Sequence, residues 1–240
     1  MEAGTLIVAV AIALAAGAVR GITGFGGAMV MSPPLALLLG PRVTVPVVLL
    51  LESVVALPML WQTRRLVDLR VVGALLVAAC LFVPLGVRVL AVADPRTMRS
   101  AIAVTVIVFS LLLLLGWRYA GKPRLATSLG LGALSGTMLG ATSIGGPPVI
   151  LYLLSGPDPI QTTRANLTLY VTVTSLIGII MLVDQRIFDA GSAWLSLWLA
   201  PAYYAGLVGG IRAFPRLNDS RFRRFTLAIL IVVSGGILVV

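Results

Sequence analysis

Histidine is absent from this chain of 240 residues, and cysteine occurs once, as Cys80. The absence of histidine removes the commonest metal ligand and the commonest general base. A lone cysteine cannot form a disulfide within the chain, and its apolar surroundings indicate a structural thiol rather than a reactive one. We therefore expect no metal and no cofactor.

Catalytic motifs are also missing. The chain has no G-x-x-x-x-G-K-[ST] motif and no H-E-x-x-H motif, so neither ATP hydrolysis nor zinc-dependent hydrolysis is supported. Intramembrane aspartyl chemistry requires two acids at depth, whereas Glu52 alone lies in the middle of an apolar segment. The sequence predicts a protein that is not an enzyme.

Charged residues are scarce and apolar residues dominate. Only 11% of residues are charged, 59% are hydrophobic and the mean hydropathy is +1.08, whereas about a quarter of a soluble domain is charged. Several apolar runs exceed the roughly 18–20 residues that cross a bilayer. This composition predicts an all-α polytopic membrane protein, with the lipid bilayer as its surroundings and no separate soluble domain.

The net charge is +10, from 18 basic residues against eight acids. The arginines gather in the predicted loops, as the positive-inside rule expects, so we predict no nucleic-acid partner. An acid, Glu2, precedes the first apolar run and Arg20 follows it. A signal peptide has the opposite arrangement, which favours a retained first helix whose N-terminus is outside.

A glycine-rich interruption occurs twice, 119 residues apart: Gly21–Gly27 reads GITGFGG and Gly140–Gly146 reads GATSIGG. The first apolar run, residues 5–39, would be about 50 Å long as one helix, against a hydrocarbon core of about 30 Å. Backbone that leaves the helix inside a membrane must be buried in protein or line a cavity. A matched pair of such breaks, one in each half, points to a transport site.

The same order of elements is predicted in two repeats, residues 1–120 and 121–240. Each repeat has a Gly-broken helix followed by three transmembrane helices. The predicted segments are 5–19, 28–39, 43–61, 71–90 and 98–117, then 125–139, 147–155, 163–183, 193–211 and 222–240. The match resumes late in each half at an offset of 124 residues, which favours an internal duplication around a basic linker at 118–124.

The basic residues favour inverted repeats. If each broken segment crosses an even number of times, 12 basic residues fall on one side and 5 on the other. If each broken segment crosses once, the split is 7 against 10. The first arrangement follows the positive-inside rule better, and a parallel four-plus-four arrangement stays open.

A helix that begins inside a membrane exposes unpaired N–H groups and a partial positive charge, so two such starts can form an anion site. Glycine lets the backbone approach a ligand, and proline suits the first helical turn. Small residues also allow close helix packing, which is our interpretation of Gly17, Gly132 and Gly136. The candidate substrate-binding residues are Thr23, Gly24, Phe25, Gly26, Gly27, Thr142, Ser143, Gly145, Gly146, Pro147, Arg164 and Asn166.

Two charged residues inside apolar segments are candidates for coupling. A carboxylate at the depth of Glu52 is costly, so it is either a proton carrier or partner of Arg20, or a neutral packing residue. Arg20 lies against the first break, where it either attracts an anion or reaches a helix end. Arg164 either faces the binding site or anchors its helix end at the membrane interface. The counterparts of Glu52 and Arg20 in the second half are Val171 and Leu139, so any such role belongs to one half.

At these residues the chain resembles the TauE/SafE family of sulfite exporters and sulfonate permeases. The resemblance rests on Gly21-x-x-Gly-Phe-Gly-Gly27, on Gly140-x-x-x-x-Gly-Gly146-Pro-Pro148 and on Arg164-Ala165-Asn166. It implies transport of small anions, notably sulfite, sulfoacetate and related sulfur-containing organic acids, across a bacterial-type plasma (inner) membrane. The first copy departs from the fuller pattern at 28–31, and Pro46 and Pro58 lie in the next helix. This departure puts symmetric use of the two halves in doubt.

The sequence therefore predicts a secondary transporter of a small anion, coupled to a proton or ion gradient. A passive anion channel and a non-transporting membrane subunit of a larger complex are the alternatives. Whether the protein forms a homo-oligomer stays open.

Overall fold

A computed structural model describes residues 3–117, 119, 124–156, 159–213 and 219–239. These residues form ten α-helices and one short 3-10 turn, with no strand among them. Glu2 and most of the basic linker at 118–124 lie outside the described residues. The first half contains α1 (Ala3–Thr23), α2 (Gly27–Leu39), α3 (Pro41–Thr63), η1 (Arg64–Leu66), α4 (Leu69–Val92) and α5 (Pro95–Leu114).

The second half contains α6 (Leu125–Thr142), α7 (Gly146–Leu153), α8 (Ile160–Asp184), α9 (Ala190–Ala213) and α10 (Asp219–Val239). Every predicted segment corresponds to one of these helices, and both predicted interruptions are confirmed. Side-chain caps fix several ends: the carboxylates of Asp68 and Asp94 accept N–H groups from the first turns of α4 and α5, as capping residues do. Asp189 caps α9 in the same way, and the backbone N–H of Ser192 lowers the pKa of its carboxyl.

Five helices are long and apolar enough to cross a membrane among the residues searched: α1, α3 with η1, α4, α5 and α8. Of α10, predicted as a transmembrane helix at 222–240, the segment Thr226–Leu238 was found only as a shorter apolar helix among the residues searched. The helices α6 and α9, which we also predicted to lie in the membrane, are not among these five. Both are rich in glycine, serine or aromatic residues, which lower the mean hydropathy. Their small residues have a different use, in helix packing.

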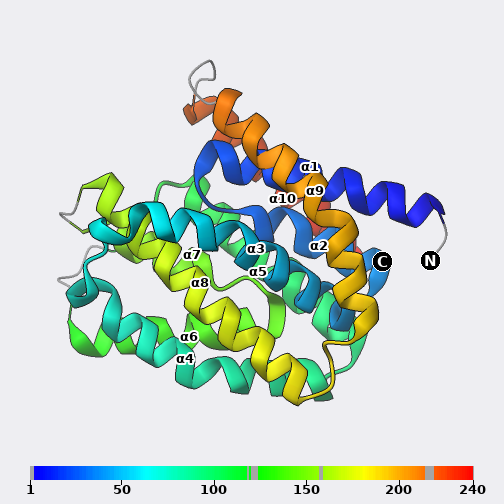
Figure 1. Cartoon of the computed structure of the whole chain (residues 1–240), viewed down its shortest axis with the longest axis horizontal. Helices are drawn as coiled ribbons and strands as arrows, with labels where there is room; N and C mark the ends of the chain where they lie inside the picture. Colours follow the sequence, from blue (N-terminus) through cyan, green and yellow to red (C-terminus); the bar gives the residue numbers. More distant parts are fainter. Residues whose placement is uncertain (1–2, 118, 120–123, 157–158, 214–218, 240) are drawn as a thin grey trace.

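The helix α1 packs along α9, shown in blue and orange in Figure 1. A Cβ atom on Gly17 would collide with the backbone oxygen of Tyr203, and one on Gly21 with that of Leu207. From the other side, a Cβ on Gly206 would collide with the oxygen of Leu14. The two backbones can approach this closely only because these positions are glycines.

The helices α4 and α6 form the matching pair, at the lower left of Figure 1. Here a Cβ on Gly132 would meet the oxygen of Leu75, one on Gly136 that of Ala79, and one on Gly86 that of Thr137. The packing interpretation of Gly17, Gly132 and Gly136 is confirmed.

The predicted breaks are shorter than the glycine clusters suggested. Gly21 and Gly140 lie inside α1 and α6, where both pack against a neighbouring helix. The non-helical residues are 24–26 and 143–145. The sequence pattern does not distinguish a glycine that packs a helix from one that ends it.

The contacts between halves are reciprocal. The first helix of each half packs on the third long helix of the other half, as α1 on α9 and α6 on α4. One apolar cluster joins α1, α2, α3 and α9, and another joins α4, α7 and α8 with Leu131 of α6. A duplicated unit would produce this pattern, and the repeat itself stays a prediction.

Candidate binding site at the two helix breaks

The first break is a tight turn between α1 and α2. The N–H of Gly24 donates to the backbone oxygen of Arg20 at 2.8 Å. Gly24 has φ +80° and Gly26 has φ +88°, a left-handed conformation that glycine adopts at little cost. The hydroxyl of Thr23 lies 2.8 Å from the oxygen of Val19 and 2.5 Å from that of Phe25, so Thr23 serves the turn itself.

The second break repeats this turn with different residues. The N–H of Ser143 donates to the oxygen of Leu139 at 2.8 Å, and Ser143 has φ +61°. The hydroxyl of Thr142 donates to the oxygen of Met138 at 2.7 Å. Thr142 and Ser143 therefore take the places of Thr23 and Gly24. The likeness ends two residues later, because Gly145 has φ −103°.

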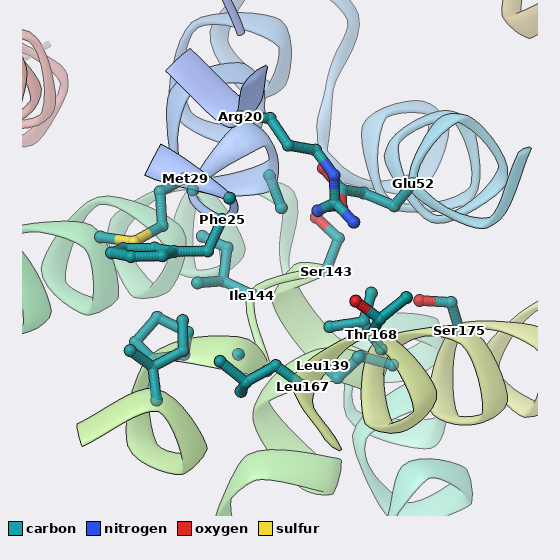
Figure 2. Close-up of a pocket in the computed structure, with 18 residues that line it drawn as sticks. Arg20, Phe25, Met29, Glu52, Leu139, Ser143, Ile144, Leu167, Thr168 and Ser175 are labelled. Carbon is teal, nitrogen blue, oxygen red and sulfur yellow. Dashed lines mark hydrogen bonds and ion pairs between the residues drawn. The ribbon is translucent and has the colours of Figure 1, made fainter. Parts of the chain in front are cut away.

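The two breaks enclose one cavity of about 50 Å³ together with α3 and α8 (Figure 2). A water molecule requires about 10–15 Å³ on this measure, so the cavity has room for a small polyatomic ion. The start of α2 and the start of α7 both border it. Of the predicted residues, those that line it are Arg20, Gly24, Phe25, Gly26, Glu52, Ser143, Gly145, Gly146 and Pro147.

The other predicted residues lie around the cavity rather than on it. Thr23 and Thr142 use their hydroxyls within the turns. Gly27 packs against the Glu52 side chain, because a Cβ at Gly27 would lie 2.5 Å from Glu52 Oε1. Arg164 is exposed, and its Nε is 3.6 Å from the place of a Cβ on Gly24, so it lies beside the first break.

Asn166 has a structural contact at the start of α8. It is fully buried, and its Oδ1 accepts the backbone N–H of Asp68 at 2.8 Å, which ties α8 to the turn before α4. The Asn166 side-chain nitrogen has no partner among the described residues. The structure thus places Asn166 at a helix junction, outside the cavity lining.

A buried charge network borders the cavity. Arg20 Nη1 donates to Glu52 Oε2 in an ion pair, and the hydroxyl of Tyr203 donates to Glu52 Oε1 at 2.6 Å. The three residues are 5%, 3% and 1% exposed. A buried charge requires such a partner, so Glu52 is bound to Arg20 in this structure. The Nε of Arg20 is also buried but has no partner within the described part of the chain.

Several members of the site were not foreseen from the sequence, and Tyr203 and Ser175 are the most informative of them. Tyr203 lies on α9, 151 residues from Glu52, and no local pattern distinguishes it from an ordinary core tyrosine. Ser175 of α8 lines the cavity, is 1% exposed, and its hydroxyl has no partner among the residues that the structure describes. A signal existed for Ser175: with Thr168 and Val171 it lies at positions i, i+3 and i+7 of an apolar helix, which share one face.

The cavity has a polar side and an apolar side. Arg20, Glu52, Ser143, Thr168 and Ser175 lie to the right in Figure 2, whereas Phe25 and Met29 lie to the left. Ile150 and Leu167 extend the apolar lining. An occupant held here would have its oxygens near Arg20 and its remainder against carbon.

The two half-helices do not contribute equally. The N–H groups at the start of an α-helix have no partner within the helix, and in α2 these belong to Gly27, Ala28 and Met29. In α7 the second and third residues are Pro147 and Pro148, which have no N–H. Most backbone donors at this cavity therefore come from α2.

A family model described as "Sulfite exporter TauE/SafE" matches residues 9–237. The chain belongs to the TauE/SafE family. No curated protein and no solved structure showed significant similarity to the chain. The predicted family is thereby confirmed over nearly the whole length, and with it a membrane protein of a sulfite exporter family rather than a family of enzymes. Both helix breaks of this TauE/SafE protein fall inside the matched range.

Proposed function

We propose that this TauE/SafE protein is a secondary transporter of a small anion, such as sulfite, sulfoacetate or a related sulfur-containing organic acid. The observation that carries the proposal is the shared cavity: two interrupted helices begin at it, and a buried arginine lines it. A channel or a structural subunit does not require this convergence.

The electrostatics of the cavity suit an anion. The N-terminus of a helix carries about half a positive charge and unpaired N–H donors. The α2 start supplies such donors, the Arg20 side chain supplies a guanidinium, and Ser175 supplies a hydroxyl. The Ser143 hydroxyl also borders the cavity but donates to the backbone oxygen of Thr142. The described residues that line the cavity include one arginine and no lysine, so among them the attraction comes from helix ends and Arg20.

The size of the cavity favours a small substrate. About 50 Å³ suits an inorganic oxyanion or a short organic one, and a longer acid requires movement of the walls. The apolar side formed by Phe25 and Met29 would accept a short carbon chain. Alternating access would then come from rocking of the two halves around the fixed site, coupled to a proton or ion gradient across the cell membrane.

The proposal is tested by flux in proteoliposomes containing the purified protein. A panel of sulfite, sulfoacetate, sulfate and simple carboxylates is offered with and without a pH gradient. We expect accumulation of at least one sulfur-containing anion against its gradient. Conductance without accumulation would support a channel, and absence of flux together with copurification of a partner would support a non-transporting subunit.

The site is tested by Gly26→Val and Gly145→Val, which we expect to abolish flux. Gly26 has φ +88°, which a β-branched residue does not adopt without strain. At Gly145 a Cβ would lie 2.5 Å from Leu139 Cβ and 2.8 Å from the Ser135 oxygen. Gly130→Val is the matched control, because no atom lies within 4 Å of a Cβ there. Normal flux in both break variants, with all three inserted in the membrane, would refute this site.

A further inference from the structure

Two ionisable residues, Arg20 and Glu52, are found among the described residues that line the cavity. Their charges cancel, so the cavity is formally neutral in this structure. The ionisable side chains that contact Glu52 within the described residues are Arg20 of α1 and Tyr203 of α9. Tyr170 of α8 bonds to Ser135 instead, and Arg164 of α8 is exposed.

An anion that enters this neutral cavity creates a problem of charge. It would add an uncompensated negative charge to a buried site that already contains the Glu52 carboxylate, and such a charge is strongly unfavourable. A proton on Glu52 removes the difficulty, because Arg20 then carries the one positive charge that faces the anion.

The unpaired Nε donor of Arg20 supports the same conclusion. Glu52 accepts from Nη1, while Nε is buried without a partner. Guanidinium presents Nε and a terminal nitrogen as a fork that matches two oxygens of one oxyanion. The ion pair with Glu52 therefore leaves the Nε of Arg20 without an acceptor. A bound oxyanion would accept hydrogen bonds from Nε and from a terminal nitrogen of the same guanidinium.

We infer that Glu52 is a tethered substitute for the transported anion: it binds Arg20 in the empty cavity and releases Arg20 to the substrate when it takes up a proton. This inference rests on the proposed function and adds its coupling step. A proton from water joins Glu52 Oε2, the Arg20–Glu52 ion pair separates, and the guanidinium forms equivalent bonds to oxygens of the anion. No electron is transferred and no covalent bond to the anion changes.

Tyr203 and Gly27 hold Glu52 in place through this exchange. The Tyr203 hydroxyl bonds to Oε1, the oxygen that Arg20 does not use, so it keeps its contact when Oε2 is protonated. A Cβ on Gly27 would collide with the Tyr203 hydroxyl and approach Oε1 to 2.5 Å. Tyr203 is thus a positioning residue, and Glu52 and Arg20 are the exchanging pair.

The first test uses the unmodified protein in proteoliposomes. The probes are methanesulfonate and ethanesulfonate, each of which carries one negative charge that is constant between about pH 6 and 8, so that a single proton on Glu52 balances it. We expect uptake of one proton per anion, measured with a pH-sensitive dye. We also expect the apparent Kd for the anion to rise with pH, by up to tenfold per pH unit for one linked proton, because two linked binding events affect each other equally. A protein that transports either probe without proton uptake, with a pH-independent Kd, would overturn the inference and leave the proposed function standing.

The second test is Glu52→Gln, with Asp184→Asn at an exposed helix end as the control. Glutamine is neutral at every pH, so the proton uptake per anion and the pH dependence of Kd should disappear. The control should keep both. A Glu52→Gln protein that retains the rise of Kd with pH would contradict the inference. If this variant fails to fold, the measurement on the unmodified protein still decides. No flux of any anion in the unmodified protein would instead defeat the proposed function.

Discussion

The two helix breaks share a turn and differ in chemistry. In both, an N–H at the turn donates to a carbonyl four residues earlier, and a threonine hydroxyl bonds to the end of its own helix. The first break adds Arg20, which is paired with Glu52, whereas the second has Leu139 at the place of Arg20. The same backbone turn is therefore compatible with a buried ion pair at the first break and with apolar residues at the second.

The glycines that align between the breaks are needed for different reasons. Gly26 has a left-handed φ, and the nearest atom to a Cβ there is 3.8 Å away. Gly145 has an ordinary φ, and a Cβ there has no room. A Cβ on Gly27 would collide with Glu52 and Tyr203, while one on Gly146 would make an ordinary contact with Ile150 at 3.5 Å. Identical letters at aligned positions therefore have different reasons: Gly26 is needed for its conformation, and Gly27 and Gly145 are needed for packing.

The largest effect should come from making the first half resemble the second. The double variant Arg20→Leu/Glu52→Val places the second-half residues in the first half. Replacing a buried ion pair by apolar residues is often neutral for stability, so we expect a folded, inserted protein. Flux should fall by about 30-fold or more, since loss of a buried charged contact costs about 2–5 kcal/mol. Flux and thermal unfolding of the purified protein measure the two outcomes.

The single variant Glu52→Val is the control for stability. It leaves Arg20 buried without its carboxylate, which costs about 3–5 kcal/mol, so its unfolding temperature should lie below that of the double variant. Full flux in the double variant would show that the charged half is dispensable, and the contrast between the two breaks would then concern folding alone.

A smaller effect is expected at Gly27 and Gly146, which differ in the room available for a side chain. Gly27→Ala forces a methyl group against the Glu52–Tyr203 contact, and overpacking of this kind costs about 1–3 kcal/mol. We expect flux to fall about tenfold or more, because 1.4 kcal/mol corresponds to a factor of ten. Gly146→Ala, its aligned partner, meets only ordinary contacts and should keep most of the flux. Equal losses in both variants, measured at equal protein amounts in vesicles, would contradict the assignment of Gly27 to the charge network.

Much of the fold was predictable from local sequence. An apolar run too long for one crossing, interrupted by glycines, indicates a broken helix by length alone. The structure accordingly begins α2 at Gly27 and α7 at Gly146. Most helices begin one to three residues before the predicted starts, because N-caps such as Gly40 and Asp94 lie outside the apolar core. The helices α5 and α7 end two or three residues earlier than predicted.

The rest depends on contacts between distant residues. Gly21 and Gly140 look like members of the breaks, yet they lie inside helices because α9 and α4 approach them. The Glu52 carboxylate gave two interpretations from sequence, and only its position between Arg20 and Tyr203 shows which group it contacts. Such pairings join three helices, so no pattern within one segment contains them.

The smallest effect concerns the aligned left-handed residues Gly24 and Ser143. A residue with a Cβ pays about 1 kcal/mol in this conformation, so Gly24→Ala should lower the free energy of unfolding by that amount. Ser143→Gly relieves the same strain but loses two hydroxyl bonds, one to Ser32 at 2.8 Å and one to the Thr142 oxygen at 2.5 Å. Together these contribute about 1 kcal/mol, so the net change should be near zero. Thermal unfolding in one detergent compares the two. If Ser143→Gly destabilises the protein as much as Gly24→Ala does, the hydroxyl bonds outweigh the backbone strain, and the two turns are alike in conformation but not in what stabilises them.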